Sequence, residues 1–335
     1  MRFNFNNLNF KPGSGMQRNV MAAVRGNQML MALFIALLLF VIGGFVSTNF
    51  LSLTNIGSIL SMAVLLGFVA AGQTLVVISG GEGVDLSVGA ATSLGAVLAV
   101  EIMHGQNNAI IPALILIIAA GALIGILNAI GIIVARVPPL VMTMAMANVV
   151  TTVQLIYTNG TPTGHPAGLV ALIGSGRLLP VLPWLVVIGI LAMVLMQALL
   201  RHTTYGYQLY AVGSNSNASY LAGVRVSLIR GGAYVLSGML SAMAGFWLIA
   251  YNNFAFVNMG VAYTLPSVAA VVIGGTSLAG GGGSYSGTMI GAIVLTVLGS
   301  LLVVLHTDEA GRQIINGVVL IALLAAYTRR PPIRQ

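Results

Sequence analysis

Charge is scarce in this 335-residue chain, in which only 5% of the residues are charged and only five are acidic. A soluble domain carries about a quarter charged residues. A chain this poor in charge cannot cover a surface that faces water, and 58% of its residues are hydrophobic. The composition therefore excludes an ordinary soluble protein and places the chain in a lipid bilayer.

Cysteine is absent, which excludes disulfides, thiolate metal sites and cysteine nucleophiles. The single lysine, Lys11, lies near the N-terminus, so the chain has no P-loop, whose lysine must reach the phosphates of a nucleotide. The four histidines are scattered over predicted loops, too far apart for metal-ligand spacing. The sequence thus predicts a protein that is not an enzyme and that holds no cofactor or metal.

Long apolar runs account for most of what the sequence does contain. A helix needs about 20 mostly apolar residues to cross a bilayer. Ten segments are candidates: 29–46, 56–79, 87–103, 109–134, 138–158, 181–200, 231–251, 263–275, 285–305 and 312–328. The third and eighth are short, and we expect the eighth to be a broken or half helix. The predicted fold is an all-α polytopic membrane protein with about ten transmembrane helices and glycine-rich broken or re-entrant segments.

Basic residues indicate how these helices are oriented. With the N-terminus in the cytoplasm, eleven of the 13 Lys and Arg residues fall on the cytoplasmic side, and only Arg177 and Arg312 fall on the other. The same bias accounts for the net charge of +8, so we predict no nucleic-acid partner. Both termini are then cytoplasmic. Residues 1–28 and 331–335 form cytosolic tails, and residues 29–330 form the transmembrane domain.

Two of the five acidic residues lie in one glycine-rich break, SGGEGVDLSVG, residues 79–89. An ionisable group at membrane depth is costly and usually marks a pathway or faces protein. Asp85 precedes the segment that starts at Ser87, where its carboxylate would cap free N–H groups of the helix, and direct contact with a solute is the alternative. Glu82 has no comparable local role, and it either lines a gate or lies in a solvated loop.

Polar residues inside the predicted spans are few, and as a set they are candidates for the lining of a path. They are Gln73, Thr74, Asn128, Thr143, Asn148, Thr151, Thr152 and Gln154. Each of them alone could instead make a hydrogen bond between helices. The seven predicted gate and path residues are Gln73, Asn128, Thr143 and Gln154 from this set, together with Glu82, Asp85 and Ser87. Small residues also recur at a spacing of four, as in Gly121 and Gly125, which predicts closely packed helices.

The stretch GGEGVDLSVG resembles the GG-x-DLSVG motif of the membrane permeases of ribose-type sugar ABC importers, in the branched-chain amino acid/ribose permease superfamily. Further stretches are similar to this family, in the same order along the chain. They are NFLSLTNIGSIL (49–60), VPPLVMTMAM (137–146), YTNG (157–160), YGYQLYAVGSNSNASYLAGVRV (205–226) and AAVVIGGTSLAGGGGSYSGTMIGA (269–292). The resemblance runs from about residue 49 to residue 326.

This resemblance implies a permease subunit in the inner membrane of a bacterium. Its implied partners are a cytosolic ABC ATPase, a periplasmic sugar-binding protein and a second permease subunit. The loop 205–230 would be the cytoplasmic coupling loop that docks on the ATPase. The matching positions in it are Gly213, Asn215, Ala218, Leu221, Ala222, Gly223 and Val224. We expect Gly213 and Gly223 to absorb turns at the ends of a short coupling helix.

Three departures from the family pattern leave the pairing of subunits open between a homodimer and a heterodimer. Three residues, 82–84, separate the glycine pair from Asp85, where the family usually has one. No acidic residue lies at 216–218, and Pro266 and Ser267 stand where relatives often have an acid. The alternative function is a secondary transporter or channel for a small polar solute, with Glu82 as its proton or ion site.

Overall fold

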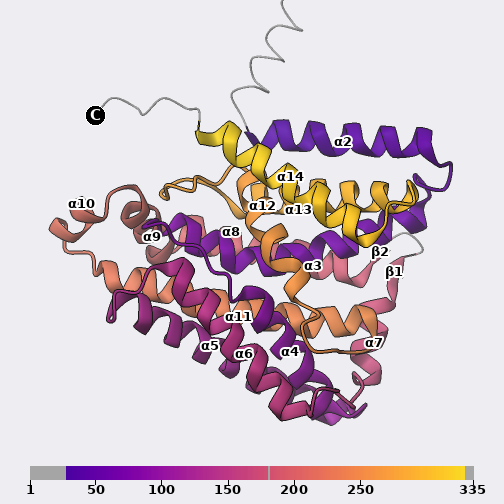
Figure 1. The fold of residues 1–335 in the computed structure, drawn as a ribbon, viewed down its shortest axis with the longest axis horizontal. Coiled ribbons are helices and arrows are strands. Elements are labelled where there is room, and N and C mark those ends of the chain that lie inside the picture. Colours follow the sequence, from indigo (N-terminus) through magenta and orange to yellow (C-terminus); the bar gives the residue numbers. More distant parts are fainter. Residues whose placement is uncertain (1–27, 180–181, 329–335) are drawn as a thin grey trace, which may run out of the picture.

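The computed structural model describes residues 28–179 and 182–328, and Figure 1 shows them as a bundle of long helices. The predicted tails, 1–28 and 331–335, lie outside the described residues apart from the first residue of α2. The main helices are α2 (Gln28–Val46), α3 (Leu53–Ile78), α4 (Val88–Met103), α5 (Ile110–Ile133), α6 (Pro139–Thr158), α8 (Trp184–His202), α11 (Val226–Asn252), α12 (Thr264–Ile273), α13 (Tyr285–Val304) and α14 (Glu309–Thr328). The predicted all-α class is confirmed.

A helix occurs at each of the ten predicted positions, but the count of ten spanning helices is not confirmed. Within the described part of the chain, seven helices are long and apolar enough to cross a membrane: α2, α3, α5, α6, α8, α11 and α13. α4 has 16 residues and α12 has 10. Each adjoins a glycine-rich connection, 79–87 before α4 and 274–284 after α12, in which several glycines have positive φ and so do not continue a helix.

Shorter elements occupy the loops. The loop between α6 and α8 contains α7 (Gly168–Ser175) and an antiparallel pair, β1 (Arg177–Leu179) and β2 (Leu182–Pro183). The predicted coupling loop contains two short helices, α9 (Thr204–Ser214) and α10 (Ser216–Leu221). α11 begins at Val226, so the last five residues of the predicted loop 205–230 belong to the first turns of that helix.

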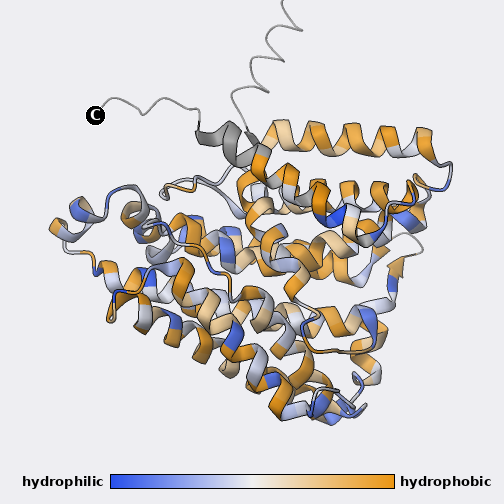
Figure 2. Ribbon diagram, viewed as in Figure 1, coloured by the Kyte–Doolittle hydropathy of each residue, from blue (hydrophilic) through white to orange (hydrophobic). Residues whose placement is uncertain are grey.

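The centre of the bundle is formed by α3 and α11. α11 packs against α3, α4 and α5, while α3 also packs against α13, which in turn contacts α2 and α12. Figure 1 shows this order as a stack that runs from α2 through α13, α3 and α11 to α5 and α6. Figure 2 shows apolar residues along the lengths of these helices, as expected for helices that are surrounded by lipid and by one another.

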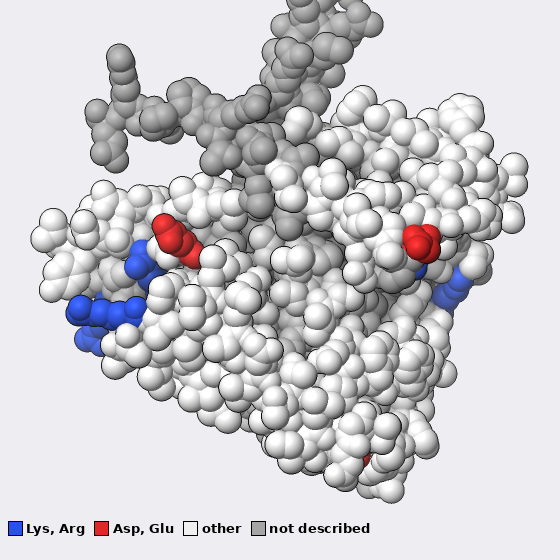
Figure 3. Space-filling view, in the orientation of Figure 1, with Lys and Arg blue, Asp and Glu red and all other residues white. Residues whose placement is uncertain are grey.

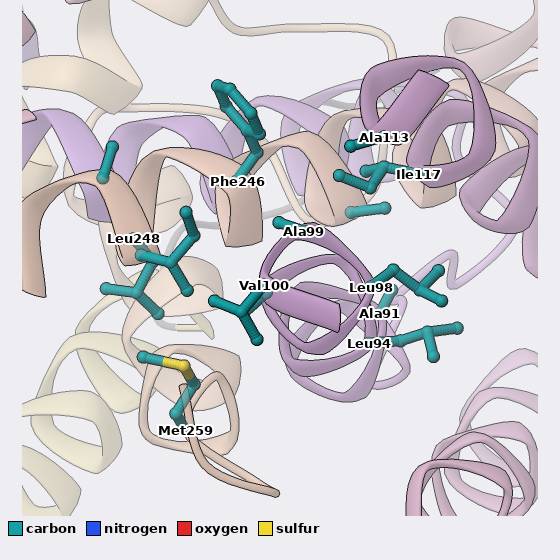
Figure 4. Close-up of a cluster of buried hydrophobic side chains, with 14 of the residues drawn as sticks. Ala91, Leu94, Leu98, Ala99, Val100, Ala113, Ile117, Phe246, Leu248 and Met259 are labelled. Carbon is teal, nitrogen blue, oxygen red and sulfur yellow. The ribbon is translucent and has the colours of Figure 1, made fainter. Parts of the chain in front are cut away.

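Small residues allow the closest helix crossings. A Cβ atom on Gly95 of α4 would overlap the carbonyl oxygen of Ala242 in α11, and one on Gly121 or Gly125 of α5 would overlap the backbone of α11. The predicted close packing at Gly121 and Gly125 is therefore confirmed. Buried apolar side chains, both small and large, fill the space around these crossings: Ala91, Leu94, Leu98, Ala99, Val100, Ala113, Ile117, Phe246, Leu248 and Met259 (Figure 4).

Four connections gather at one end of the bundle, the end where α9 and α10 lie in Figure 1. They are residues 79–87, 134–138, 203–225 and 274–284, which join α3 to α4, α5 to α6, α8 to α11 and α12 to α13. Four of the described arginines lie in or beside these connections: Arg136, Arg201, Arg225 and Arg230. Figure 3 shows basic side chains at the two ends of the molecule and an uncharged band between them.

Candidate functional site

The buried carboxylate of Asp85 is the centre of the candidate site. Its Oδ1 accepts hydrogen bonds from the backbone N–H of Ser87 (2.9 Å) and from the Ser87 hydroxyl (2.6 Å). Its Oδ2 accepts a hydrogen bond from the hydroxyl of Ser237 in α11 (2.7 Å). Asp85 is 0% exposed. These three donors stabilise a carboxylate that solvent does not reach, because hydrogen bonds to a charged acceptor are the strong ones.

Further hydrogen bonds tie the segment 85–87 to three more helices. The N–H of Asp85 donates to Oε1 of Gln73 in α3 (3.3 Å). The N–H of Leu86 donates to the hydroxyl of Thr143 in α6 (3.0 Å). The side-chain amide of Asn128 in α5 donates to the Ser87 hydroxyl (2.9 Å). We call this set the Asp85 network; its members are Gln73, Asp85, Ser87, Asn128, Thr143 and Ser237.

The local sequence explains how the chain returns into the bundle to form this network. Gln73 lies five residues before the end of α3, so Asp85 sits beside the helix about 7.5 Å inside that end. The reversal uses three consecutive residues with left-handed backbone: Gly80 (φ 71°), Gly81 (φ 68°) and Glu82 (φ 57°). Glycine adopts this conformation without strain, which accounts for the glycine pair at the break.

Five of the seven predicted gate and path residues belong to the Asp85 network: Gln73, Asp85, Ser87, Asn128 and Thr143. Gln154 lies elsewhere on α6 and donates to the carbonyl of Ala90 in α4 (3.1 Å). Glu82 lies outside the network and is exposed.

The structure also refines the role predicted for Asp85 in capping α4. Asp85 binds the N–H of Ser87, which is the N-cap residue of α4, rather than the free N–H groups of the first turn. Ser237 could not be identified as part of this site from the sequence. A serine at a helix interface does not by itself predict a hydrogen bond to a carboxylate, because only the fold brings Asp85 to it.

The network is closed to solvent, so in this structure it does not line an open path. Its side chains are at most 1% exposed. Two of its polar atoms, Nε2 of Gln73 and Oδ1 of Asn128, find no hydrogen-bond partner among the described residues. Exposed polar residues of the predicted lining instead occur on α6, where Asn148 and Thr152 lie on the exposed face.

The two short helices of the coupling loop form a second feature, which we call the α9–α10 segment (residues 203–225). The side chain of Asn215 caps α10 by accepting the N–H of Ala218 (2.9 Å). Gly223 follows α10 with φ 83°, which confirms the expected turn. Gly213 differs from expectation because it lies inside α9 rather than at a left-handed turn.

The outer surface of the α9–α10 segment is apolar at its tip. Tyr220 is 72% exposed and Leu221 is 85% exposed, although no lipid-spanning helix carries them. Ala222, the next residue, is also exposed, while Val224 packs back against the core. The tip therefore presents a small apolar knob at the end of the bundle where the arginines gather.

These features define a class of protein: a multi-pass membrane protein in which α3, α5, α6 and α11 share a buried polar network, with a helical segment projecting from one end. The family described as branched-chain amino acid transport system / permease component matches residues 55–324. The chain belongs to this family.

Curated relatives agree with this assignment. The chain is 36% identical over 296 residues to the ribose import permease protein RbsC of Escherichia coli, covering 87% of this chain and 90% of that protein. It is 34% identical over 291 residues to RbsC of Bacillus subtilis, covering 86% and 89%. It is 32% identical over 305 residues to the autoinducer 2 import system permease protein LsrC of Escherichia coli, covering 90% and 87%. No solved structure matches the chain.

Proposed function

We propose that this chain is the membrane-spanning permease subunit of an ATP-driven importer in the bacterial inner membrane. It forms the path for a monosaccharide that a periplasmic binding protein delivers. The observation that carries this proposal is the similarity, over nearly the whole chain, to permease proteins named for the import of ribose and of autoinducer 2. Energy comes from a separate cytosolic ABC ATPase, because this chain contains no P-loop.

In this proposal, the end that carries the α9–α10 segment faces the cytoplasm. The arginines at 136, 201, 225 and 230 support this orientation, since basic residues concentrate in cytoplasmic loops. Ten membrane-inserted helices, with α4 and α12 as the short ones, then leave both termini in the cytoplasm. The glycine-rich connections after α3 and α12 are the broken segments of the bundle.

The α9–α10 segment is the surface that binds the ATPase. Its exposed apolar tip suits a groove on the partner, whereas residues 216–218 offer no carboxylate for an ion pair. Buried apolar anchors dominate the energy of such interfaces. Some of the predicted coupling residues then shape the segment, and others touch the partner. The set is Gly213, Asn215, Ala218, Leu221, Ala222, Gly223 and Val224.

Leu221→Asp is expected to weaken binding of the ATPase by about 30-fold, because the change places a charge in the apolar contact. Binding can be measured by titrating the purified ATPase against the permease in detergent micelles. Leu169→Asp is the matched control, since Leu169 is an exposed leucine of α7 outside the α9–α10 segment. Equal affinities of Leu221→Asp and wild type would exclude the tip as the docking site.

The path for the sugar runs along the exposed face of α6, where a second permease subunit, identical or different, completes it. α6 buries one narrow stripe of residues, namely Thr143, Met146, Val150, Gln154 and Thr158. Its exposed face carries Asn148 and Thr152, and polar groups facing lipid would be unfavourable. Hydroxyl and amide groups suit a neutral solute that is rich in hydroxyls.

Asn148→Leu is expected to lower the maximal rate of sugar uptake by about fivefold while leaving assembly of the complex intact, because one polar contact in the path is worth about 1 kcal/mol. Uptake into vesicles that contain the whole complex measures this effect. Val194→Leu, at an exposed position of α8 outside the proposed path, is the control. An unchanged rate in Asn148→Leu would remove α6 from the path.

One experiment distinguishes the importer from the alternative function, because the two predict opposite results. Sugar uptake is measured in vesicles that contain the permease alone or the permease with ATPase and binding protein. Each kind of vesicle is supplied either with ATP or with a proton gradient. The importer needs both partners and ATP, and Glu82→Gln leaves its uptake unchanged. Uptake by the permease alone that follows the proton gradient and is lost in Glu82→Gln would establish the secondary transporter. The exposed position of Glu82, outside the Asp85 network, favours the importer.

A further inference from the structure

The end of α9 is in direct backbone contact with two loops that are far apart in the sequence. A Cβ atom on Gly213 would overlap the carbonyl oxygen of Ile78 and would come within 2.5 Å of the backbone nitrogen of Gly281. A Cβ atom on Gly280 would overlap Cα of Gly80. We call this contact the glycine joint; its residues are Gly80, Gly213, Gly280 and Gly281. It exists only because none of the four carries a side chain.

Hydrogen bonds hold the three parts of the joint together. The N–H of Gly281 donates to the carbonyl of Ile78 (2.9 Å), which connects the loop 274–284 to the end of α3. The hydroxyl of Tyr210 in α9 donates to the carbonyl of Gly283 (2.9 Å). Burial raises the pKa of the Tyr210 phenol, although the charge of Arg201 opposes this effect, so the hydroxyl stays a neutral donor at physiological pH.

α11 joins the same contact through Arg230. Its Nε donates to the carbonyl of Ser79 (3.3 Å), and its guanidinium lies against Gly81, where a Cβ atom would be 3.0 Å from Cζ. A positive charge at the C-terminal end of α3 also interacts favourably with the helix dipole. The loop after α3 is therefore held from two sides, by α9 and by α11.

A short stretch of chain connects the joint to the Asp85 network. Only residues 81–84 separate Gly80 from Asp85, and the N–H of Gly83 donates back to the carbonyl of Gly80 (3.3 Å). From Asp85 the hydrogen bonds continue to α5, α6 and α11. A displacement of α9 therefore has a continuous, closely packed route to the helix that carries Asn148 and Thr152.

We propose that the glycine joint transmits the movement of the α9–α10 segment to the loops 79–87 and 274–284, with Gly213 as its positioning residue. This inference rests on the proposed function, in which the ATPase moves the segment. Backbone packed directly on backbone leaves no flexible side chain to absorb a displacement, so both loops follow α9. Through the Asp85 network, the movement then reaches α6 and opens or closes the path.

The test measures sugar uptake and ATP hydrolysis together in vesicles that contain the full complex of permease, ATPase and binding protein. Gly213→Ala should leave the ATPase bound and hydrolysing, while sugar molecules taken up per ATP fall about tenfold. Gly282→Ala is the matched control, because it lies in the same glycine-rich loop and its Cβ would meet nothing closer than 3.9 Å. A wild-type ratio in Gly213→Ala would overturn the proposal.

A milder variant tests the glycine joint if the complex with Gly213→Ala does not assemble. Tyr210→Phe removes only the hydroxyl that binds Gly283, and it should lower the ratio about threefold. Tyr251→Phe, at the opposite end of α11 from Arg230 and outside both the α9–α10 segment and the Asp85 network, should leave the ratio unchanged. A wild-type ratio in Tyr210→Phe would then refute the joint, whereas wild-type uptake that needs no ATP would refute the proposed function instead.

Discussion

Replacing Asp85 with alanine is expected to lower the free energy of unfolding by about 3 kcal/mol and to abolish uptake. The change leaves the N–H of Ser87 and the hydroxyls of Ser87 and Ser237 without their acceptor in a region closed to solvent. The hydroxyls can turn toward backbone carbonyls, but the N–H cannot. Losing the cost of a buried charge offsets only part of this penalty.

Asp85→Asn keeps the shape and presents one acceptor oxygen instead of two, so its loss should be smaller, at about 1.5 kcal/mol. Glu82→Ala is the matched control, because this neighbouring acid is exposed, and its effect should stay within about 0.5 kcal/mol. Thermal unfolding of the purified proteins in one detergent compares all three. If Asp85→Ala unfolds at the wild-type temperature, the network does not hold the helices together.

Replacing Gly238 with leucine is expected to prevent folding of the bundle. A Cβ atom at this position of α11 would overlap the carbonyl oxygen of Gly121 in α5 and would come within 3.0 Å of the nitrogen of Gly125. The two helices would have to separate, which would break the contacts of α11 with α4 as well. Even Gly238→Ala should cost about 2 kcal/mol, near the middle of the range for overpacking a core.

The effect should appear as a loss of monodisperse protein in size-exclusion chromatography after membrane extraction. Gly299→Leu supplies the comparison, because a Cβ atom at this position of α13 would meet nothing within 4 Å. It should behave as wild type. A normal yield of folded Gly238→Leu would mean that α5 and α11 do not cross as closely as the structure places them.

Much of the helical architecture could be predicted from hydropathy, because helices in lipid are apolar over their full length. The α3 and α5 segments were predicted to within a few residues of their observed bounds. The short helices α4 and α12 were predicted to within two residues, as 87–103 and 263–275, because glycine-rich stretches interrupt the apolar sequence beside them. The α9–α10 segment was expected as a coupling loop through family resemblance, but its division into two helices was not.

The candidate site could be predicted only in part. Residue type identified Gln73, Asn128 and Thr143 as rare polar groups in apolar spans, and the structure brings all three to Asp85 or its neighbours. Their meeting depends on the return of the chain after Gly80, which is a tertiary feature. The role of Gly213 was also out of reach, because a close backbone contact leaves no pattern in the local sequence.

In the proposed function, a partner ATPase drives this bundle from the end that carries the α9–α10 segment. Because the chain has no cysteine, a single Leu221→Cys can carry a photoreactive cross-linker, with Leu169→Cys in α7 as the matched position. In the active complex, the account predicts that Leu221→Cys cross-links to the ATPase and Leu169→Cys does not. Cross-linking from Leu169→Cys, or none from Leu221→Cys in a complex that still hydrolyses ATP, would contradict it.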